Sequence, residues 1–249
     1  MSQNQVSYAS QYRYPRRRPI RFLLRQGIRL AFAVLSDLRI IGQENLPRSG
    51  PLIVVANHFH FVDPAALIRT APWPLEILGA LQMVDAPRTV TWLPGLWGAY
   101  TVRRGAASRT AMRASKAVLE QNGVLGIFPE GGSWAPSLRP ARPGAAYLAA
   151  QTGAPILPIG LDGLVDLFPR LRHGRHARVT ARIGKPFGPF QATGKGREKR
   201  GQLIDIGHTI MGHIAELIPP ERRGVYSSDP SIRAAAEHAA IYPYDDLGG

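Results

Sequence analysis

The stretch "VVANHFHFVDPAAL", residues 54–67, marks the point at which an apolar run gives way to a helix-like pattern. The apolar part, "PLIVVA" at 51–56, has the length and composition of a short buried strand. Asp63 followed by Pro64 is a typical helix start, because aspartate caps free backbone amides and proline suits the first turn. We therefore predict a strand, a turn that carries His58 and His60, and then a helix.

The rest of the chain continues to alternate between strand and helix patterns. Further strands are predicted where apolar or alternating runs occur, at residues 75–80, 123–128, 154–160 and 177–184. Helical spacing is found in the segments between and after them, at 108–121, 143–152, 199–218 and 231–240. This order predicts an α/β fold: a single layered domain with a central, mostly parallel or mixed sheet flanked by helices.

Charge and cysteine content restrict the classes of function. Among 249 residues there are 31 Lys and Arg against 17 Asp and Glu, a formal net charge of +14. Such a surface attracts phosphates on a membrane, a nucleic acid or a small substrate. The lack of cysteine excludes disulfides and thiolate chemistry. We expect no membrane-spanning helix and no signal peptide, because arginines interrupt the apolar N-terminal segment.

We expect the chain to divide into a basic N-terminal region (1–40), a main domain (41–218) and a peripheral C-terminal tail (219–249). Within the first region, residues 1–19 are predicted to be a flexible arm and 20–38 an amphipathic helix. One stripe of this helix is basic, with Arg18, Arg21, Arg25 and Arg29. The helix could dock on a membrane with its arginines at lipid phosphates, or pack on its own domain with its arginines in water.

A second candidate for membrane contact is "TVTWLPGLWGAY", residues 89–100. Its tryptophans, Trp92 and Trp97, suit the headgroup region of a bilayer, and they equally suit a protein core.

His58 and Asp63 are the candidate catalytic pair. Ligands of open α/β sheets bind beyond the carboxyl ends of the strands, which is where His58 is expected. An aspartate five residues later can hold one imidazole tautomer and leave the other ring nitrogen as a general base. The alternative is that Asp63 only caps the helix and the histidines are ordinary polar residues at a strand end.

Metal binding is a further alternative for the same residues. His58, His60 and Asp63 partly match the H-x-H-x-D-H pattern of metallo-β-lactamase-type hydrolases, but the aspartate comes one residue late and Pro64 replaces a histidine. The remaining histidines in the main domain have no familiar metal spacing. We expect neither a metal nor a cofactor.

Four ordered motifs carry a resemblance to a known family. "NHFHFVDP" (57–64) resembles the N-H-x-x-x-x-D signature of the glycerolipid acyltransferases, the PlsC-like family that includes 1-acylglycerol-3-phosphate acyltransferases. "GAYTVRR" (98–104), "FPEGGSW" (128–134) and "APILPIG" (154–160) resemble its three later signatures. "LRPARPGAA" (138–146) is similar to the stretch that follows the third, with Arg142 where lysine is usual. The joint match is far more specific than any single motif.

The resemblance implies transfer of a fatty acyl group from acyl-CoA or acyl carrier protein to the hydroxyl of a lysophospholipid. The expected acceptor is 1-acylglycerol-3-phosphate and the product is phosphatidic acid. His58 would be the general base and Asp63 its orienting partner. Substrate binding would fall to Arg104, Glu130, Gly131, Gly132 and Arg142. The family also implies a peripheral location on the cytoplasmic face of the cell membrane, at an anionic lipid surface.

One departure from the family keeps other functions open. Gly132 and Ser133 stand where the family has Thr-Arg, so a phosphate-binding cation is missing, and Arg103, Arg139 or Arg142 could replace it. The acceptor could therefore be another lysolipid, such as a lyso-ornithine lipid. The charge alone would also fit a non-enzymatic protein that binds membranes or nucleic acid, but no nucleic-acid motif is recognised and we expect no such partner.

Overall fold

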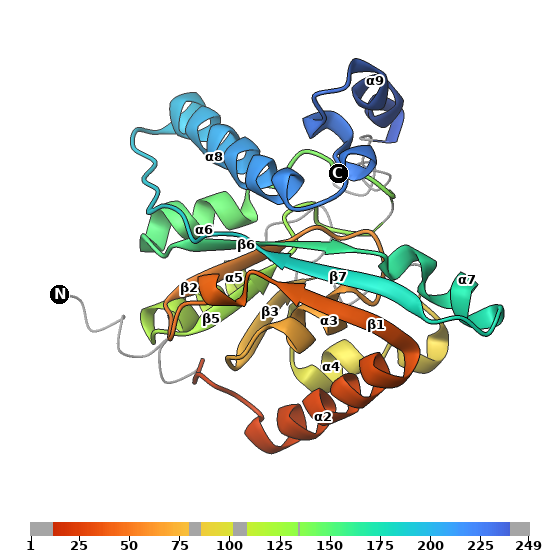
Figure 1. Cartoon of the computed structure of the whole chain (residues 1–249). Coiled ribbons are helices and arrows are strands. Elements are labelled where there is room, and N and C mark those ends of the chain that lie inside the picture. Colours follow the sequence, from red (N-terminus) through yellow and green to blue (C-terminus); the bar gives the residue numbers. More distant parts are fainter. Residues whose placement is uncertain (1–11, 80–85, 102–108, 134, 240–249) are drawn as a thin grey trace.

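The computed structural model describes residues 12–79, 86–101, 109–133 and 135–239. Within these residues, seven strands form one sheet in the order β1-β7-β6-β2-β5-β3-β4 (Figure 1). The strands are β1 (Ser36–Ile41), β2 (Leu52–Ala56), β3 (Leu75–Gly79), β4 (Tyr100–Thr101), β5 (Val124–Ile127), β6 (Ile156–Asp162) and β7 (Ala177–Ile183). Neighbouring strands are parallel except for β6 and β7, which are antiparallel. The predicted layered α/β domain is confirmed.

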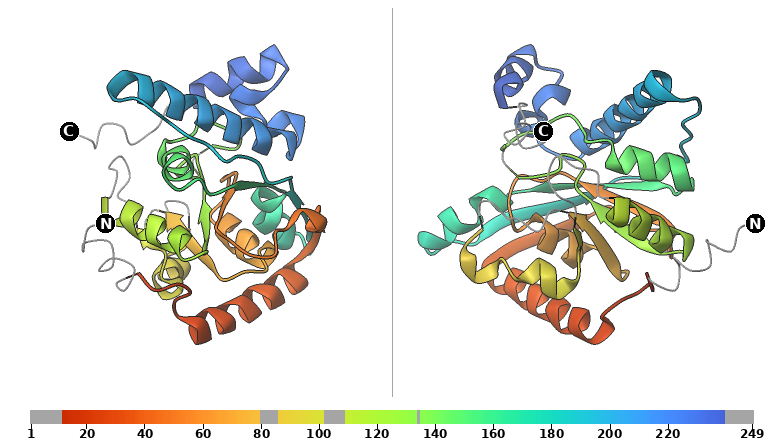
Figure 2. Two further views of the ribbon diagram at one scale, coloured as in Figure 1. Left: turned by 90° about the vertical axis from the view of Figure 1, so that its left-hand side faces the viewer. Right: turned by 180° about the vertical axis from the view of Figure 1, so that it is seen from behind.

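Helices cover both faces of this sheet (Figures 1 and 2). One face carries α2 (Arg18–Leu35), α3 (Asp63–Thr70), α4 (Leu93–Trp97) and α7 (Leu167–Arg172), and the other carries α5 (Arg109–Glu120), α6 (Gly144–Thr152) and α8 (Gly196–Glu216). The short helix α9 (Pro230–Ala239) lies at the periphery. Short 3₁₀ turns occur at Gln43–Asn45, Arg88–Val90, Leu164–Asp166, Pro220–Arg222 and Gly224–Tyr226.

Strand β2 lies near the middle of the sheet and is buried on both faces. Leu52, Val54 and Ala56 pack into the core under α3, whereas Ile53 and Val55 pack under α5, α6 and α8. Side chains alternate across a strand, so a central parallel strand needs apolar residues at every position. This is why the run at 52–56 is apolar throughout.

The connections around β2 and β5 run in opposite directions. From β2 the chain passes through α3 to β3 on one side, and from β5 it passes through α6 to β6 on the other. Open α/β sheets bind ligands at such a switch point, outside the carboxyl ends of the strands. The segments that follow β2 and β5 are 57–62 and 128–133, which contain the candidate site residues His58, Glu130, Gly131 and Gly132.

The N-terminal helix ends earlier than predicted. Helix α2 ends at Leu35, and Ser36 begins β1, whereas we had expected the helix to continue to residue 38. Strand β1 exists because it pairs with β7, from Ser36 opposite Ala177 to Ile41 opposite Arg182. No described helix combines the length and the hydropathy needed to cross a bilayer.

Two arginines of the predicted stripe face the protein. Arg21 is 5% exposed and forms a two-pronged ion pair with Glu76, with N–O distances of 2.6 and 2.8 Å. Arg25 donates to the carbonyls of Ala71 and Trp73 after the end of α3. The expectation that these arginines meet lipid or water is wrong, because buried carbonyls and a carboxylate bind them instead.

The arm that precedes α2 is bound to the domain over its described part. The Tyr14 hydroxyl donates to the carbonyl of Pro74 at 2.6 Å, and Arg16 pairs with Glu76 at 2.7 Å. Arg17 donates to the carbonyls of Gly95 and Leu96 in α4. From Tyr12 onwards, the arm is therefore not the flexible segment that its composition suggested.

Candidate active site

His58 and Asp63 meet at the end of β2. His58 Nδ1 lies 3.0 Å from Asp63 Oδ2, and the imidazole packs against the ring of Phe128, with a centroid distance of 4.4 Å. Asp63 is only 1% exposed, whereas His58 is half-buried and lines a cavity. Because Nδ1 faces the carboxylate, Nε2 is the ring nitrogen left for a substrate.

Asp63 also holds the turn that carries His58. Its Oδ2 accepts the backbone N–H groups of Phe59 at 2.6 Å and His60 at 2.7 Å. Asp63 is thus both an orienting partner of the histidine and a cap on the turn before α3. The prediction that Asp63 caps the helix is wrong in detail, because Val62 is the N-cap of α3 and Asp63 is its first residue, with a carboxylate that binds the preceding turn instead.

Asn57 locks the end of β2 to its neighbour β6. Its side-chain amide donates to the Leu161 carbonyl at 2.8 Å, and its side-chain oxygen accepts the Leu161 N–H at 2.7 Å. The residue is fully buried. Asn57 therefore fixes the backbone immediately before His58, a role that we had not predicted for this part of the motif.

Glu130 supports His58 from behind the site. One carboxylate oxygen accepts the backbone N–H of His58 at 2.7 Å, and the other lies 3.3 Å from two nitrogens of Arg139. Glu130 is 1% exposed and Arg139 is 2% exposed. Glu130 itself does not line the cavity, although Gly131 and Gly132 beside it do.

Opposing effects act on the pKa of Glu130. Burial raises the pKa of Glu130 to about 7, against the lowering effects of the Arg139 charge and of the hydrogen bond from the His58 amide. A buried carboxyl with one arginine partner lies closer to its protonated form than an exposed one. A buried carboxyl with a raised pKa beside His58 and Asp63 is the kind of group found at functional sites.

The loop after β5 brings glycine and arginine to the cavity wall. Gly131 has a φ of 78°, a left-handed conformation that favours glycine. A Cβ atom at this position would lie 3.2 Å from Cγ of Arg142, so the absence of a side chain lets Arg142 lie close to the loop. The Arg142 amide donates to the Pro129 carbonyl at 2.7 Å, and Arg142 lines the cavity.

The structure separates the candidate replacements for the missing family arginine. Arg142 lines the cavity, whereas Arg139 is buried behind it, bound to Glu130 and to the Gly132 carbonyl at 2.5 Å. Arg103 and Arg104 lie outside the described residues. From the sequence, Arg139 was predicted only as a possible phosphate ligand. Nothing in its local motif indicated that it would bridge Glu130 and the glycine loop.

The cavity beside His58 has a volume of about 1450 Å³ and two chemically different parts. Its apolar part is lined from α2, α3 and α4, by residues such as Leu24, Ile28, Ala65, Ile68, Leu93 and Trp97. Its basic part is lined from α5 and α8, by Arg109, Arg113, Lys116, Lys199 and Arg200. An amphiphilic ligand with a long apolar segment and anionic groups fits such a space.

The two tryptophans of residues 89–100 differ in burial. Trp97 is 5% exposed, and its indole N–H donates to the Leu75 carbonyl at 3.1 Å, whereas Trp92 is 57% exposed. One tryptophan therefore belongs to the core and the other to the surface. Among the described residues, no group of three or more His, Asp or Glu side chains is arranged to hold a metal.

A positioned imidazole with a buried carboxylate partner, facing a cavity, defines a site for proton transfer to or from a bound substrate. The chain belongs to the acyltransferase family, since the family model described as Acyltransferase matches residues 37–162, half of its length. The predicted family is confirmed. Membership also supports an enzyme over the alternative of a basic protein that only binds.

The relatives agree with this assignment. The 1-acyl-sn-glycerol-3-phosphate acyltransferase of Borreliella burgdorferi is 31% identical over 139 residues, which cover 54% of this chain and 55% of that protein. The enzyme of the same name from Saccharomyces cerevisiae is 29% identical over 181 residues, covering 68% and 59%. The chain thus spans a little over half the length of these curated relatives.

A solved structure has the same fold. It is the 1-acyl-sn-glycerophosphate acyltransferase PlsC from Thermotoga maritima, with a TM-score of 0.54 and 24% sequence identity. The likeness covers 83% of this chain and 86% of that one.

Proposed function

We propose that this chain transfers a fatty acyl group from a thioester donor to the free hydroxyl of 1-acylglycerol-3-phosphate, which yields phosphatidic acid. The observation that carries the proposal is the 3.0 Å contact between His58 Nδ1 and Asp63 Oδ2 on the wall of an amphiphilic cavity. The names of the two curated relatives support the choice of acceptor.

In the proposed reaction, His58 Nε2 takes the proton of the acceptor hydroxyl as its oxygen attacks the thioester carbonyl carbon. Asp63 stabilises the imidazolium that results. The tetrahedral intermediate then loses its carbon–sulfur bond, and the imidazolium returns the proton to the departing thiolate. The products are an ester and a free thiol. A thioester is activated enough that one base, contributing about 10²–10⁴-fold, is a reasonable share of the catalysis.

Arg142 and the glycine loop are proposed to bind the acceptor phosphate. Arginine presents a planar fork that matches two phosphate oxygens, and glycines allow a phosphate to approach the backbone closely. Arg104 keeps the same proposed role on the strength of the family motif. Glu130 is proposed to act through its neighbours, because its carboxylate holds the His58 amide and Arg139 rather than facing the cavity.

The acyl chain is proposed to lie in the apolar part of the cavity, between α2, α3 and α4. The basic part suits the phosphates of acyl-CoA or the acidic surface of an acyl carrier protein. Both donors therefore belong in the assay.

Helix α2 is proposed to rest on the cytoplasmic face of the membrane. Its outer side chains Phe22, Leu23, Leu30 and Val34 are 60%, 69%, 67% and 56% exposed. Apolar groups of this kind enter the acyl boundary of a bilayer. The inner side of the same helix carries Leu24 and Ile28 into the cavity, so docking through α2 would bring the cavity to its lipid substrate.

The test is release of free thiol by purified protein given acyl-CoA and 1-acylglycerol-3-phosphate. His58→Ala should abolish release, and Asp63→Asn should lower it about 10²–10⁴-fold, with the circular dichroism spectrum unchanged. His173→Ala is the matched control, because His173 is exposed and lies at the end of α7. Undiminished turnover in His58→Ala would refute the mechanism.

A second acceptor is favoured by one observation, the Gly132-Ser133 pair in place of the family's Thr-Arg. A lysolipid without a phosphate monoester, such as a lyso-ornithine lipid, should therefore be compared with 1-acylglycerol-3-phosphate. If phosphate recognition is correct, Arg142→Ala should lower kcat/KM about tenfold to a hundredfold for the phosphate acceptor alone, since a charge-assisted hydrogen bond is lost. An equal loss of kcat/KM with both acceptors would show that Arg142 does not recognise the phosphate monoester, and would favour the other lipid class.

A further inference from the structure

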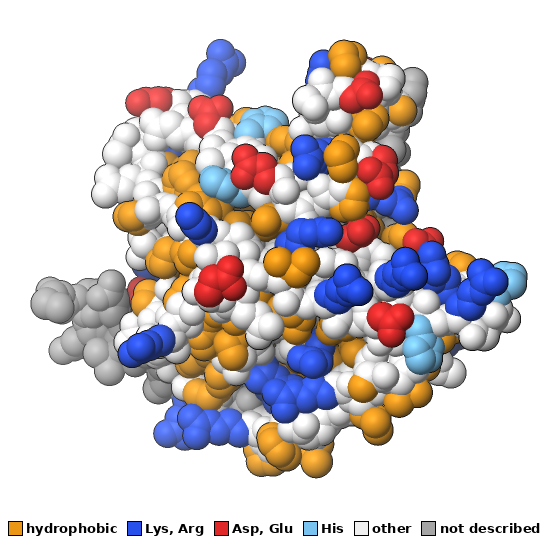
Figure 3. Space-filling model, in the orientation of Figure 1, with side chains coloured by type: hydrophobic (Ala, Val, Ile, Leu, Met, Phe, Trp, Pro, Cys, Tyr) orange, Lys and Arg blue, Asp and Glu red, His pale blue; other side chains and the backbone are white. Residues whose placement is uncertain are grey.

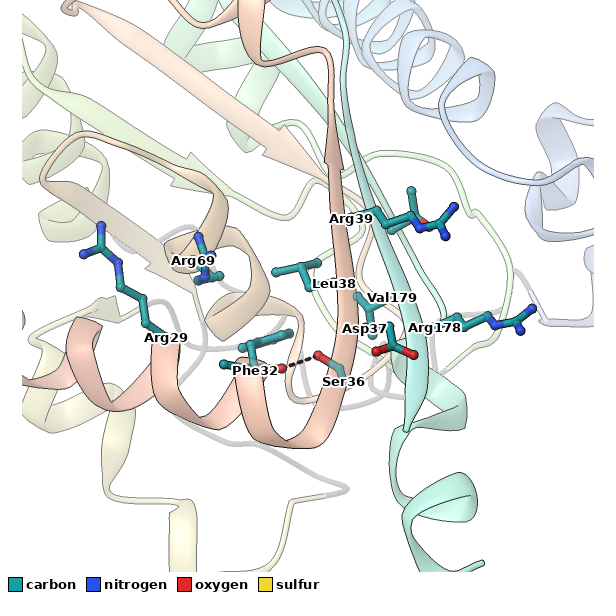
Figure 4. Close-up of a pocket in the computed structure, with 11 residues that line it drawn as sticks. Arg29, Phe32, Ser36, Asp37, Leu38, Arg39, Arg69, Arg178 and Val179 are labelled. Atoms are coloured by element: carbon teal, nitrogen blue, oxygen red, sulfur yellow. Dashed lines mark hydrogen bonds between the residues drawn. The ribbon is translucent and has the colours of Figure 1, made fainter. Parts of the chain in front are cut away.

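A second pocket, separate from the cavity at His58, lies between α2 and the sheet edge at β1 and β7. We name it the arginine groove, after the four arginines in its lining, Arg29, Arg39, Arg69 and Arg178. Its volume is about 790 Å³, and its lining has no described residue in common with the active-site cavity. Phe32, Leu38 and Val179 provide an apolar floor. Figure 4 shows the groove.

Two arginines of the groove lie on each side of β1, but the carboxylate is on one side only. Arg29 of α2 and Arg69 of α3 lie on one side of the strand without a carboxylate among the described lining residues, whereas Arg39 and Arg178 lie on the other side with Asp37 (Figure 4). Asp37 is the one carboxylate among the described lining residues, and it lies 3.9 Å from His176. The side with Arg29 and Arg69 therefore has an excess of positive charge.

The excess of positive charge also affects the pKa of the neighbouring Arg25. The pKa of Arg25 is lowered, first by burial and then by the positive charges of Arg29 and Arg69. Cations that repel one another in this way gain free energy when an anion binds among them. Arginine pairs from two helices offer several donors to the oxygens of one phosphate group.

The groove borders the outer apolar side of α2. Leu30 and Val34 lie close to Arg29 along the helix and are 67% and 56% exposed, and Ile41 at the end of β1 is 51% exposed. Figure 3 shows Lys and Arg side chains gathered over α2 and β1, with hydrophobic side chains along the edge below them. Cations placed just above apolar groups match the order of headgroup and acyl chain in a lipid leaflet.

We propose that the arginine groove binds the phosphate-bearing headgroup of an anionic phospholipid while α2 lies on the bilayer. The occupant is a lipid rather than a soluble phosphate because the cations lie beside exposed apolar side chains, which a lipid would cover and a soluble phosphate would not. The groove gives the docking surface a preference for anionic lipid. The proposal rests on the membrane docking described under Proposed function.

The test compares vesicles of phosphatidylcholine alone with an equal mixture of phosphatidylcholine and phosphatidylglycerol, using co-sedimentation of the full chain. The double variant Arg29→Gln/Arg69→Gln should bind the mixed vesicles about 25-fold more weakly, since each cation at an anionic surface contributes about fivefold. Its binding to neutral vesicles should be unchanged. Its thiol release with detergent-dispersed substrate should also be unchanged, because the active-site cavity is separate.

The matched control is Lys195→Gln/Arg197→Gln, which removes the same charge from exposed residues at the start of α8, at the opposite end of the molecule from α2 (Figure 1). This pair should change binding to mixed vesicles less than about twofold, because screening limits charge effects to roughly 10 Å. An equal loss in both pairs would refute the groove in favour of diffuse charge. Displacement of the wild type by inorganic phosphate at equal ionic strength would assign the groove to a soluble anion.

The two proposals fail in different ways. If the wild type binds neither kind of vesicle, the membrane docking itself is wrong and the groove proposal falls with it. If the wild type binds both kinds equally, docking stands and only the groove proposal is refuted. Thiol release decides the catalytic proposal independently of both.

Discussion

Two buried glutamates of this chain, Glu76 and Glu130, have pKa values that are shifted in opposite directions. Glu76 is fully buried on β3 and is held by two arginines, Arg16 at 2.7 Å and Arg21 at 2.6 and 2.8 Å. Glu130 is 1% exposed and has one arginine partner, Arg139, at 3.3 Å. The pKa of Glu76 is lowered, whereas that of Glu130 is raised to about 7.

The number of arginine partners decides whether burial or hydrogen bonding sets the direction of the pKa shift. Burial raises both pKa values, but hydrogen bonds from Arg21 and Arg16 outweigh it at Glu76. Arg21 and Arg16 also donate to the carbonyls of Trp97 and Gly98, so the Glu76 cluster ties the N-terminal arm and α4 to the sheet. Glu130 instead links the turn of His58 to the glycine loop. We infer that the first cluster maintains the scaffold and the second tunes the site.

The largest effect is expected from breaking the Glu76 cluster. Glu76→Gln leaves the buried Arg21 without a carboxylate and should lower the free energy of unfolding by about 3–5 kcal/mol. Urea unfolding measures this, with Glu120→Gln as the control. Glu120 pairs with Lys116 at 3.6 Å on the exposed side of α5, so its loss should cost less than about 1 kcal/mol. Comparable losses in the two variants would contradict the proposed scaffold role.

A smaller effect, on turnover rather than on stability, is expected at Arg139. Arg139→Met should lower kcat about tenfold to a hundredfold, because displacement of the His58 turn by a fraction of an ångström spoils proton transfer. The pKa of Glu130 should rise further without its cation, so the acid limb of the pH–rate profile should move to higher pH. Arg139→Lys should restore that limb in part.

The control for this positioning role is Arg222→Met, which removes a partly buried arginine that donates to the Pro136 carbonyl. It should leave the pH–rate profile unchanged. If Glu76→Gln lowers kcat of the folded enzyme as much as Arg139→Met does, the two glutamate clusters are not separate in function.

The smallest effect is expected on the pH dependence of stability, which tests whether Glu76 is ionised in the folded protein. Because the folded pKa of Glu76 lies below its ordinary value of 4.5, the ionised group contributes stability that is complete above about pH 4.5. That contribution is lost as pH falls through the lowered pKa. The wild type should therefore lose unfolding free energy more steeply below pH 4.5 than Glu76→Gln. Parallel curves in a series of urea unfoldings would show that Glu76 is not the group responsible.

Local patterns were sufficient for most of the elements. Asp63-Pro64 predicted the start of α3 at the residue where the structure begins it, and the alternation at 177–184 predicted β7. Spacing also suggested the meeting of His58 and Asp63, since five residues span one turn. Strand β1 could not be predicted in this way, because its partner β7 lies far along the chain and its own residues continue a helical pattern.

The orientation of α2 shows the same division. Its sequence shows that one side is basic and another apolar, but no local pattern indicates which side faces inward. Arg21 faces inward because Glu76, 55 residues away, is buried beneath it, and Arg25 because the carbonyls after α3 need donors. The usual expectation that cations face outward therefore fails at Arg21 and Arg25, although Leu24 and Ile28 of the same helix face inward.

The sequence by itself determined the strand–helix order and the acyltransferase family and indicated that His58 could pair with Asp63, since each depends on residue types at short, regular spacings. The tertiary structure alone decided that Glu130 binds Arg139 behind the site, that Trp97 is buried and Trp92 exposed, and that four arginines from α2, α3, β1 and β7 share one groove. The physical reason is the range of the forces involved. Backbone conformation responds to near neighbours, whereas burial and charge pairing depend on segments that only folding brings together.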